Sequence, residues 1–108
     1  MPKIIHESGK RKRAVARATL KPGKGRVKIN NQSLDVYGTK IARLKLKEPI
    51  IIAEGTASEV DINVVVNGGG PNSQAEAARL AIARALAKYS KKLEKKFLNY
   101  DRHLLVAD

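Results

Sequence analysis

Residues 60–89 read VDINVVVNGGGPNSQAEAARLAIARALAKY, and the predicted fold is built around this stretch. Its first part, residues 61–66, is rich in β-branched side chains, which is typical of a buried strand. Residues 68–71, Gly-Gly-Gly-Pro, end that run, and residues 73–89 then carry apolar side chains at helical spacing. The pattern predicts a strand, a glycine turn and an alanine-rich helix that packs closely on the sheet.

The turn and the start of the helix carry a second pattern. Ser73 and Glu76 stand three residues apart, as in a capping box, so Ser73 is predicted to be the N-cap. The three glycines can adopt positive φ, and the helix N-terminus after them favours an anion. Strand-to-helix turns of this kind bind phosphates. As a nucleotide site the pattern is weak, because no Gly-Lys-Ser/Thr follows and the spacing is not G-x-G-x-x-G.

The sequence lacks the side chains that a nucleotide-using enzyme would need. A phosphotransfer site needs a lysine on the phosphates and acids that hold magnesium. Asp61 and Glu76 flank the turn, but no lysine lies between Lys47 and Lys88. We therefore expect no catalytic residue, no cofactor and no small-molecule substrate.

The composition points to a polyanionic partner. The chain has 108 residues, enough for one domain over 1–108 with one modest core. It carries 22 Lys+Arg against 10 Asp+Glu, a formal charge of +12, so nucleic acid is the first candidate. Cysteine is absent, and His6 and His103 are most simply surface residues, so no metal site is expected. No apolar run reaches the length of a membrane span, and we predict a soluble, intracellular protein without a membrane partner.

The positive charge is concentrated near the N-terminus. Residues 1–30 contain ten Lys/Arg and one acid, whereas residues 48–78 contain five acids and no base. Aromatic residues make up only 4% of the chain, so stacking of bases on rings is poorly supported. Phosphate contacts are the expected binding mode.

An alternating pattern over residues 13–21 predicts a strand with two unlike faces. Arg13, Arg17 and Lys21 fall on one face, and small apolar side chains fall on the other. A short strand over residues 4–8 precedes it and is predicted to end at the next residue, a glycine.

The basic alternation returns over residues 26–29, after a turn at residues 22–25. This repetition predicts that the two basic strands pair as a β-hairpin. Like charges would then face each other across the strands, which destabilises the hairpin unless an external anion supplies the countercharge. The pattern therefore favours polyanion binding over a solvated surface.

The rest of the chain gives local predictions only. Thr39 is predicted to cap a short helix over residues 39–47 that Glu48 and Pro49 stop. The remaining predictions are an apolar segment over 49–53 that could be a helical turn or a buried strand, a loop over 54–59, a short helix after residue 90 and a strand over 104–106.

Several motifs together resemble one known family along nearly the whole chain. The sequence is similar to small-subunit ribosomal protein nine (universal family uS9) in its archaeal form. The resemblance rests on GKRKRAVARA at 9–18, GGG at 68–70, QAEAAR at 74–79, IARAL at 82–86, DR at 101–102 and LL at 104–105.

The resemblance implies an α+β fold of the kind seen in domain 2 of ribosomal protein S5. This fold is a two-layer sandwich of a mainly antiparallel sheet with helices on one face and a left-handed βαβ crossover, a handedness that is rare. The resemblance also implies a place in the head of the small subunit of the cytoplasmic ribosome, bound to its rRNA and beside other head proteins.

The sequence departs from the family pattern in two places. Ser73 stands where the family pattern Gly-Gly-Gly-x-x-Gly-Gln has its fourth glycine, so a close backbone approach to RNA is not carried over to that residue. Family members also continue into a basic tail that reaches peptidyl-site tRNA, whereas this sequence ends at Asp108 without such a tail. The resemblance therefore assigns the tRNA contact to no residue in this numbering.

The predicted interface combines the basic strands, the glycine turn and arginines of the later segments. Composition alone leaves an architectural DNA-binding protein open as the alternative, and the resemblance favours rRNA. The predicted RNA-binding residues are Lys10, Arg11, Lys12, Arg13, Arg17, Lys21, Lys24, Arg26, Gly68, Gly69, Gly70, Gln74, Arg79, Arg84 and Arg102.

Overall fold

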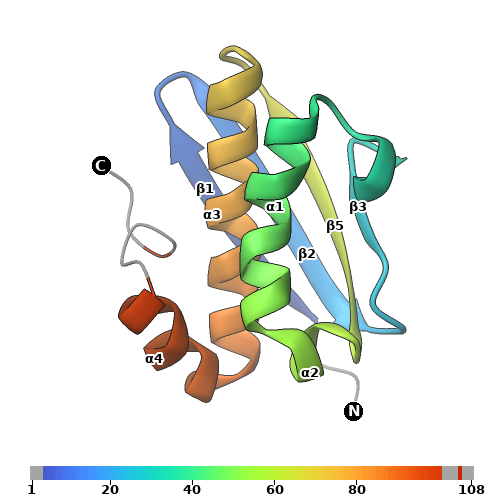
Figure 1. Cartoon of the computed structure of the whole chain (residues 1–108), viewed down its shortest axis with the longest axis vertical. Coiled ribbons are helices and arrows are strands. Elements are labelled where there is room, and N and C mark those ends of the chain that lie inside the picture. The colour runs from blue at the N-terminus through green and yellow to red at the C-terminus, as the bar shows by residue number, and fades with distance from the viewer. Residues whose placement is uncertain (1–3, 101–104, 106–108) are drawn as a thin grey trace.

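The computed structural model describes residues 4–100 and 105. It has one five-stranded sheet with helices packed on one face, as predicted (Figure 1). In chain order the elements are β1 (Ile5–Arg11), β2 (Ala14–Pro22), β3 (Val27–Ile29), β4 (Gln32–Ser33), the 3₁₀ helix η1 (Leu34–Val36), α1 (Lys40–Ile52), α2 (Glu54–Ala57), β5 (Val60–Asn67), α3 (Pro71–Tyr89) and α4 (Lys91–Tyr100).

The strand order is β1-β2-β5-β3-β4, and only β3 and β5 are parallel. The predicted hairpin between the two basic strands is therefore wrong, because β5 lies between β2 and β3. The hairpin that forms instead joins β1 to β2 through Lys12 and Arg13, with Arg11 opposite Ala14. The alternating faces of residues 13–21 were predicted correctly, but β2 pairs with β5, which lies far along the chain.

The connection from β3 to β5 crosses the sheet through α1. In Figure 1, β3 and β5 run in the same direction, α1 lies on the viewer's side of the sheet, and β5 lies to the left of β3. That arrangement makes the crossover left-handed, as the family resemblance implies, whereas most such connections are right-handed.

Small residues bring α3 close to the sheet. The inner face of β2 presents buried Ala14, Ala16 and Ala18, and α3 contributes its own buried alanines. Gly9 is buried within β1, and a Cβ there would collide with the carbonyl oxygen of Ala77 and lie 2.7 Å from the nitrogen of Ala81. The prediction that the strand ends at Gly9 is therefore wrong, because this glycine lets α3 approach β1.

The helix α1 begins as predicted and ends later than predicted. Thr39 is its N-cap, and the hydroxyl oxygen accepts a hydrogen bond from the nitrogen of Ala42 at 3.1 Å. Pro49 lies inside the helix, not at its stop, because it is buried and the following turn packs against the core. The segment left open as helix or strand is this last turn, and part of the predicted loop after it forms α2.

The helix α3 begins earlier than predicted, with its N-cap three residues before Ser73. Gly70 is the N-cap and Pro71 occupies the first turn, where a missing N–H costs nothing. Ser73 is thus not the N-cap. The predicted α4 is confirmed, and α1 and α4 both contact α3, which buries α3 on several sides. Of the predicted strand over 104–106, Leu105 lies in a turn and its neighbours fall outside the described residues.

In the described part of the chain, no helix combines the length and the apolar content needed to cross a bilayer.

Candidate nucleic-acid interface

The glycine turn packs directly against the turn of the β1–β2 hairpin. Gly68 and Gly69 have φ of 78° and 67°, values that favour glycine. A Cβ on Gly68 would collide with the carbonyl oxygen of Arg13, and one on Gly69 would lie 3.1 Å from the nitrogen of Ala14. Figure 1 shows both turns at the same end of the molecule. We call this region, residues 12–13 and 68–70, the hairpin end.

Gln74 holds the glycine turn in place. Its side-chain nitrogen donates a hydrogen bond to the carbonyl oxygen of Gly68 at 3.1 Å. Its side-chain oxygen accepts one from the hydroxyl of Tyr37 at 3.5 Å. Burial raises the pKa of Tyr37 above its ordinary value, so the hydroxyl stays protonated and can donate. The predicted RNA-binding residue Gln74 thus supports the turn.

The N-terminus of α3 adds positive potential at the hairpin end. No side chain caps the helix, so the N–H groups of its first turn receive no bond from the N-cap residue. The helix dipole places partial positive charge at the same place. Beside it, Lys12 and Arg13 are exposed, and neither forms an ion pair with a carboxylate in the described residues. This combination is suited to phosphate binding.

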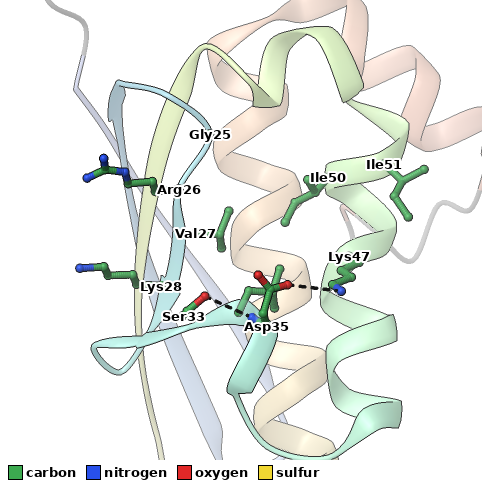
Figure 2. Close-up of a pocket in the computed structure, with 10 residues that line it drawn as sticks. Gly25, Arg26, Val27, Lys28, Ser33, Asp35, Lys47, Ile50 and Ile51 are labelled. Atoms are coloured by element: carbon green, nitrogen blue, oxygen red, sulfur yellow. Dashed lines mark hydrogen bonds and ion pairs between the residues drawn. The ribbon is translucent and has the colours of Figure 1, made fainter.

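A second basic region lies on the sheet face that carries no helix. Lys10, Arg17 and Lys28 are exposed there, on three different strands. Figure 2 shows Lys28 and Arg26 pointing away from α1. We call this helix-free surface of β1, β2, β5 and β3 the open face.

Like charges do not oppose each other on the open face. Arg17 lies between Ser8 of β1 and Val65 of β5. The prediction that like charges face each other across two basic strands is therefore wrong, because neutral residues stand opposite Arg17. The three cations stay accessible because their strand neighbours are neutral.

Lys24 and Arg26 lie at the other end of the sheet. Asp61 accepts hydrogen bonds from the backbone nitrogens of Arg26 and Lys24, each at 3.0 Å. These two bonds hold the pKa of Asp61 below its ordinary value. Lys21 stands opposite Asp61 in the strand pairing. Since β2 has nine residues, this loop lies about 30 Å from the hairpin end, estimated from the rise of a strand.

Three predicted arginines are used within the fold. Arg79 forms an ion pair with Glu48 of α1 at 2.9 Å, and its side chain is only 15% exposed. Arg84 donates to the carbonyl oxygens of Ser8 and Leu105, both at 2.9 Å. Arg11, discussed next, pairs with Glu76. Arg102 lies outside the described residues.

The Arg11 pair joins the hairpin to α3. The Nε of Arg11 lies 2.8 Å from a Glu76 oxygen, and the Nζ of Lys45 lies 3.5 Å from the other. Burial raises the pKa of Glu76, but the hydrogen bond from Arg11 and the charges of Lys45 and Arg11 outweigh that effect and lower it. Glu76 is therefore ionised and holds two cations, so Arg11 is not free to bind an external anion.

The described residues contain no group of three His, Cys, Asp or Glu side chains that could hold a metal ion.

The family model for ribosomal protein S9/S16 matches residues 9–108 of the chain. The chain belongs to the ribosomal protein S9/S16 family. The resemblance noted in the sequence, and with it the preference for a ribosomal protein over an enzyme, is confirmed by this match.

Curated archaeal relatives agree with the S9/S16 assignment. The chain is 45% identical over 108 residues to small ribosomal subunit protein uS9 of Methanothrix thermoacetophila, covering 98% of the chain and 82% of the relative. It is 44% identical over 108 residues to the protein of the same name in Methanococcus maripaludis strain C5, covering 98% of the chain and 81% of the relative.

The structure of this S9/S16 family member also brings Lys28 into the basic surface, a residue absent from the predicted set. Lys28 stands opposite Asn63 of β5 and Ser33 of β4. The alternation of basic and apolar residues over 26–29 was the feature of the sequence that could have identified Lys28. That pattern was assigned to a hairpin that does not form, and in the structure β5 separates Lys28 from Arg17 on the open face.

Proposed function

We propose that this chain is a structural constituent of the small ribosomal subunit and binds its rRNA through the hairpin end and the open face. One observation carries the proposal. Lys12 and Arg13 have exposed side chains that form no ion pair with a described carboxylate, and the backbone of their turn packs against the glycine turn from which α3, a helix of 19 residues without a side-chain cap, begins. The names of the archaeal relatives support the small subunit as the setting.

The binding mode follows from the chemistry of this surface. Lysine and arginine side chains and free backbone N–H groups bind phosphate oxygens, and such contacts fix position without reading sequence. Lys10 and Arg17 extend the cationic surface from the hairpin end along the open face. This binding mode does not require aromatic side chains that stack on RNA bases. The protein would then act as a clamp on folded rRNA, since it neutralises phosphates that would otherwise repel each other.

The finer details of the assignment remain part of the proposal. We place the protein in the head of the small subunit of the cytoplasmic ribosome, among other head proteins. We assign no described residue to peptidyl-site tRNA. An architectural DNA-binding role is the less favoured alternative, because membership of a ribosomal protein family supports rRNA.

The test is the salt dependence of binding to small-subunit rRNA. The double variant Arg13→Gln with Arg17→Gln removes one cation from the hairpin end and one from the open face. We expect weaker binding to all RNA sequences, and a slope of log affinity against log salt that is smaller by roughly two.

The matched control is Lys92→Gln with Lys95→Gln, on the exposed surface of α4. It lowers the net charge by the same amount at a place outside the proposed interface. We expect its affinity and slope to stay close to those of the unmodified protein. Equal losses for the two double variants would show that net charge alone drives binding and would refute the proposed interface.

A further inference from the structure

A row of polar side chains crosses the open face of the sheet. The strand pairing places His6 of β1 opposite Thr19 of β2. Thr19 in turn stands opposite Asn63 of β5, and Asn63 opposite Lys28 of β3. Residues directly opposite each other on neighbouring strands point to the same face, and Lys28 points away from α1 in Figure 2. We call His6, Thr19, Asn63 and Lys28 the polar row.

The amide of Asn63 is available to an external partner. Asparagine is depleted in strands, and β5 is the central strand of this sheet. The Asn63 side chain is exposed and forms no hydrogen bond with a described residue. Asn30, in contrast, bonds the backbone nitrogen and the carbonyl oxygen of Val66 through its amide. A residue that opposes the local preference without such a contact is a candidate for binding.

His6 and Thr19 also keep hydrogen-bonding capacity. The Nδ1 of His6 lies 3.2 Å from the hydroxyl oxygen of Thr19. If Nδ1 accepts from the hydroxyl, the Nε2–H of the ring and a lone pair of the hydroxyl oxygen stay available. If Nδ1 donates, the hydroxyl proton and the Nε2 lone pair stay available. The pair therefore offers a donor and an acceptor in either tautomer, as the amide of Asn63 does.

The surroundings of the row are cationic, because two acids near it have partners within the chain. Glu7 lies 3.4 Å from the Nζ of Lys88. Asp61, two residues before Asn63, accepts hydrogen bonds from two backbone nitrogens of the loop over residues 24–26. A hollow of about 360 Å³ adjoins the row at β1 and β2, and the residues that line it are His6, Glu7, Ser8, Arg17, Ala18 and Thr19.

Double-stranded RNA fits this arrangement of groups. Its wide, shallow minor groove displays 2′-hydroxyls, each a donor and an acceptor, between two lines of phosphates. The backbone positions of Arg17 and Lys28 are about 12 Å apart, from two strand spacings and the rise of two residues. The minor groove of B-form DNA is narrower, about 6 Å, and has no such hydroxyl. The strands β1, β2, β3 and β5 contain no Phe, Tyr or Trp, so stacking on unpaired bases is not supported.

We propose that the polar row binds 2′-hydroxyl groups in the minor groove of an rRNA double helix, while Arg17 and Lys28 contact phosphates on its two sides. Asn63 and the His6–Thr19 pair each bond a ribose, so the open face distinguishes RNA from DNA. Phosphate contacts alone do not make this distinction. The inference rests on the proposed function, because it names the part of the rRNA that the open face receives.

The test measures binding to an RNA duplex and to a DNA duplex of the same sequence, at matched salt concentrations. The double variant Thr19→Val with Asn63→Val removes the hydroxyl and the amide without changing the charge. Valine is favoured in strands, so the variant should stay folded. We expect the unmodified protein to prefer RNA and the variant to lose about tenfold of that preference. Its DNA affinity and its slope of log affinity against log salt should not change.

The matched control is Thr56→Val with Asn99→Val, which makes the same chemical changes in α2 and α4, away from the sheet. This control should keep the full preference for RNA. The Arg13 and Arg17 double variant gives the opposite pattern, because it lowers the salt slope and weakens binding to both duplexes.

The outcomes separate the two proposals. Failure of the unmodified protein to bind either the RNA duplex or small-subunit rRNA would overturn the proposed function and this inference together. Binding to rRNA with equal affinity for the two duplexes would overturn the inference alone. A preference for RNA that the Thr19 and Asn63 variant retains would also overturn it and leave the polar row to a different partner, such as a neighbouring protein. An equal loss of affinity for RNA and DNA would overturn it as well, since the substitutions would then have disturbed phosphate contacts.

Discussion

The arginines of the hairpin end and the arginines of the helix layer look alike in the sequence and differ in the structure. Arg13 is exposed at a two-residue turn and pairs with no described carboxylate. Arg79 is nearly buried and bonded to Glu48. Arg84 is bonded to two backbone carbonyls. One set is available to an external anion, and the other holds elements of the same chain together.

The basic residues of this chain therefore have two separate roles. Two of the five acids of residues 48–76 are neutralised from within, since Glu48 and Glu76 each receive an arginine from a distant element. Lys12 and Arg13 at the hairpin end have no such partner among the described residues, so we expect their countercharge to come from outside. Net charge therefore overstates the number of residues that can bind RNA.

The largest expected effect comes from Gly69→Val. Valine at a φ of 67°, with a Cβ 3.1 Å from both the nitrogen and the Cβ of Ala14, adds strain and overlap at the turn. We expect a loss of roughly 2–4 kcal/mol of unfolding free energy, measured by urea denaturation. At concentrations where the variant is folded, its rRNA affinity should fall less than that of the Arg13 and Arg17 double variant.

Gly70→Ala is the control within the same turn. A Cβ at Gly70 would meet no atom within 4 Å, and its φ of −98° suits any residue. The cost should stay below about 1 kcal/mol, the range for an alanine at an N-cap. If Gly69→Val kept full stability and lost RNA binding, the turn would touch RNA directly and the structural explanation would be wrong.

A smaller effect should separate the two kinds of arginine. Arg79→Met removes the ion pair and leaves Glu48 without its partner, so we expect a loss of about 2 kcal/mol in unfolding free energy. Its rRNA affinity, measured on folded protein, should not change. Arg17→Met should give the reverse result, with stability within about 0.5 kcal/mol and weaker, less salt-dependent binding. If Arg79→Met and Arg17→Met changed stability and rRNA affinity in the same way, the distinction between structural and RNA-binding arginines would be wrong.

The local elements could be read from the sequence because they depend on neighbouring residues. The strand over 61–66, the cap at Thr39 and the start of α4 after residue 90 follow from periodicity and turn chemistry. Buried packing overrode local signals where the two disagreed. Pro49 stays inside α1 and Gly9 stays inside β1, because each packs against the helix layer or the core.

Long-range pairing could not be read from alternation. The residues of β5 that enter between β2 and β3 follow them by about forty positions, and nothing in the basic pattern of residues 13–29 reports that partner. The left-handed crossover came from the family resemblance alone. For the same reason, the sequence could not show which arginines meet Glu48 or Ser8.

The smallest expected effect concerns pH and compares Glu76 near the hairpin end with Asp61 at the opposite end. The pKa of each carboxyl is lowered in the folded protein, so each ionised form contributes stability above its unfolded pKa, near 4.5 for Glu76 and 3.8 for Asp61. That contribution should be lost as the pH falls below these values. For Glu76, whose side chain is 37% exposed, solvent screening should keep the effect below about 1 kcal/mol. Urea denaturation of Glu76→Gln and Asp61→Asn between pH 7 and pH 3 measures it, because each variant should lose less stability on acidification than the unmodified protein. The Glu76→Gln substitution should in addition remove the carboxylate that offsets the charges of Arg11 and Lys45, so this variant alone is expected to strengthen rRNA binding slightly at pH 7. If Glu76→Gln left rRNA affinity unchanged, the cations around Glu76 would lie outside the reach of bound rRNA, and the interface would be confined to the residues of the hairpin end and the open face.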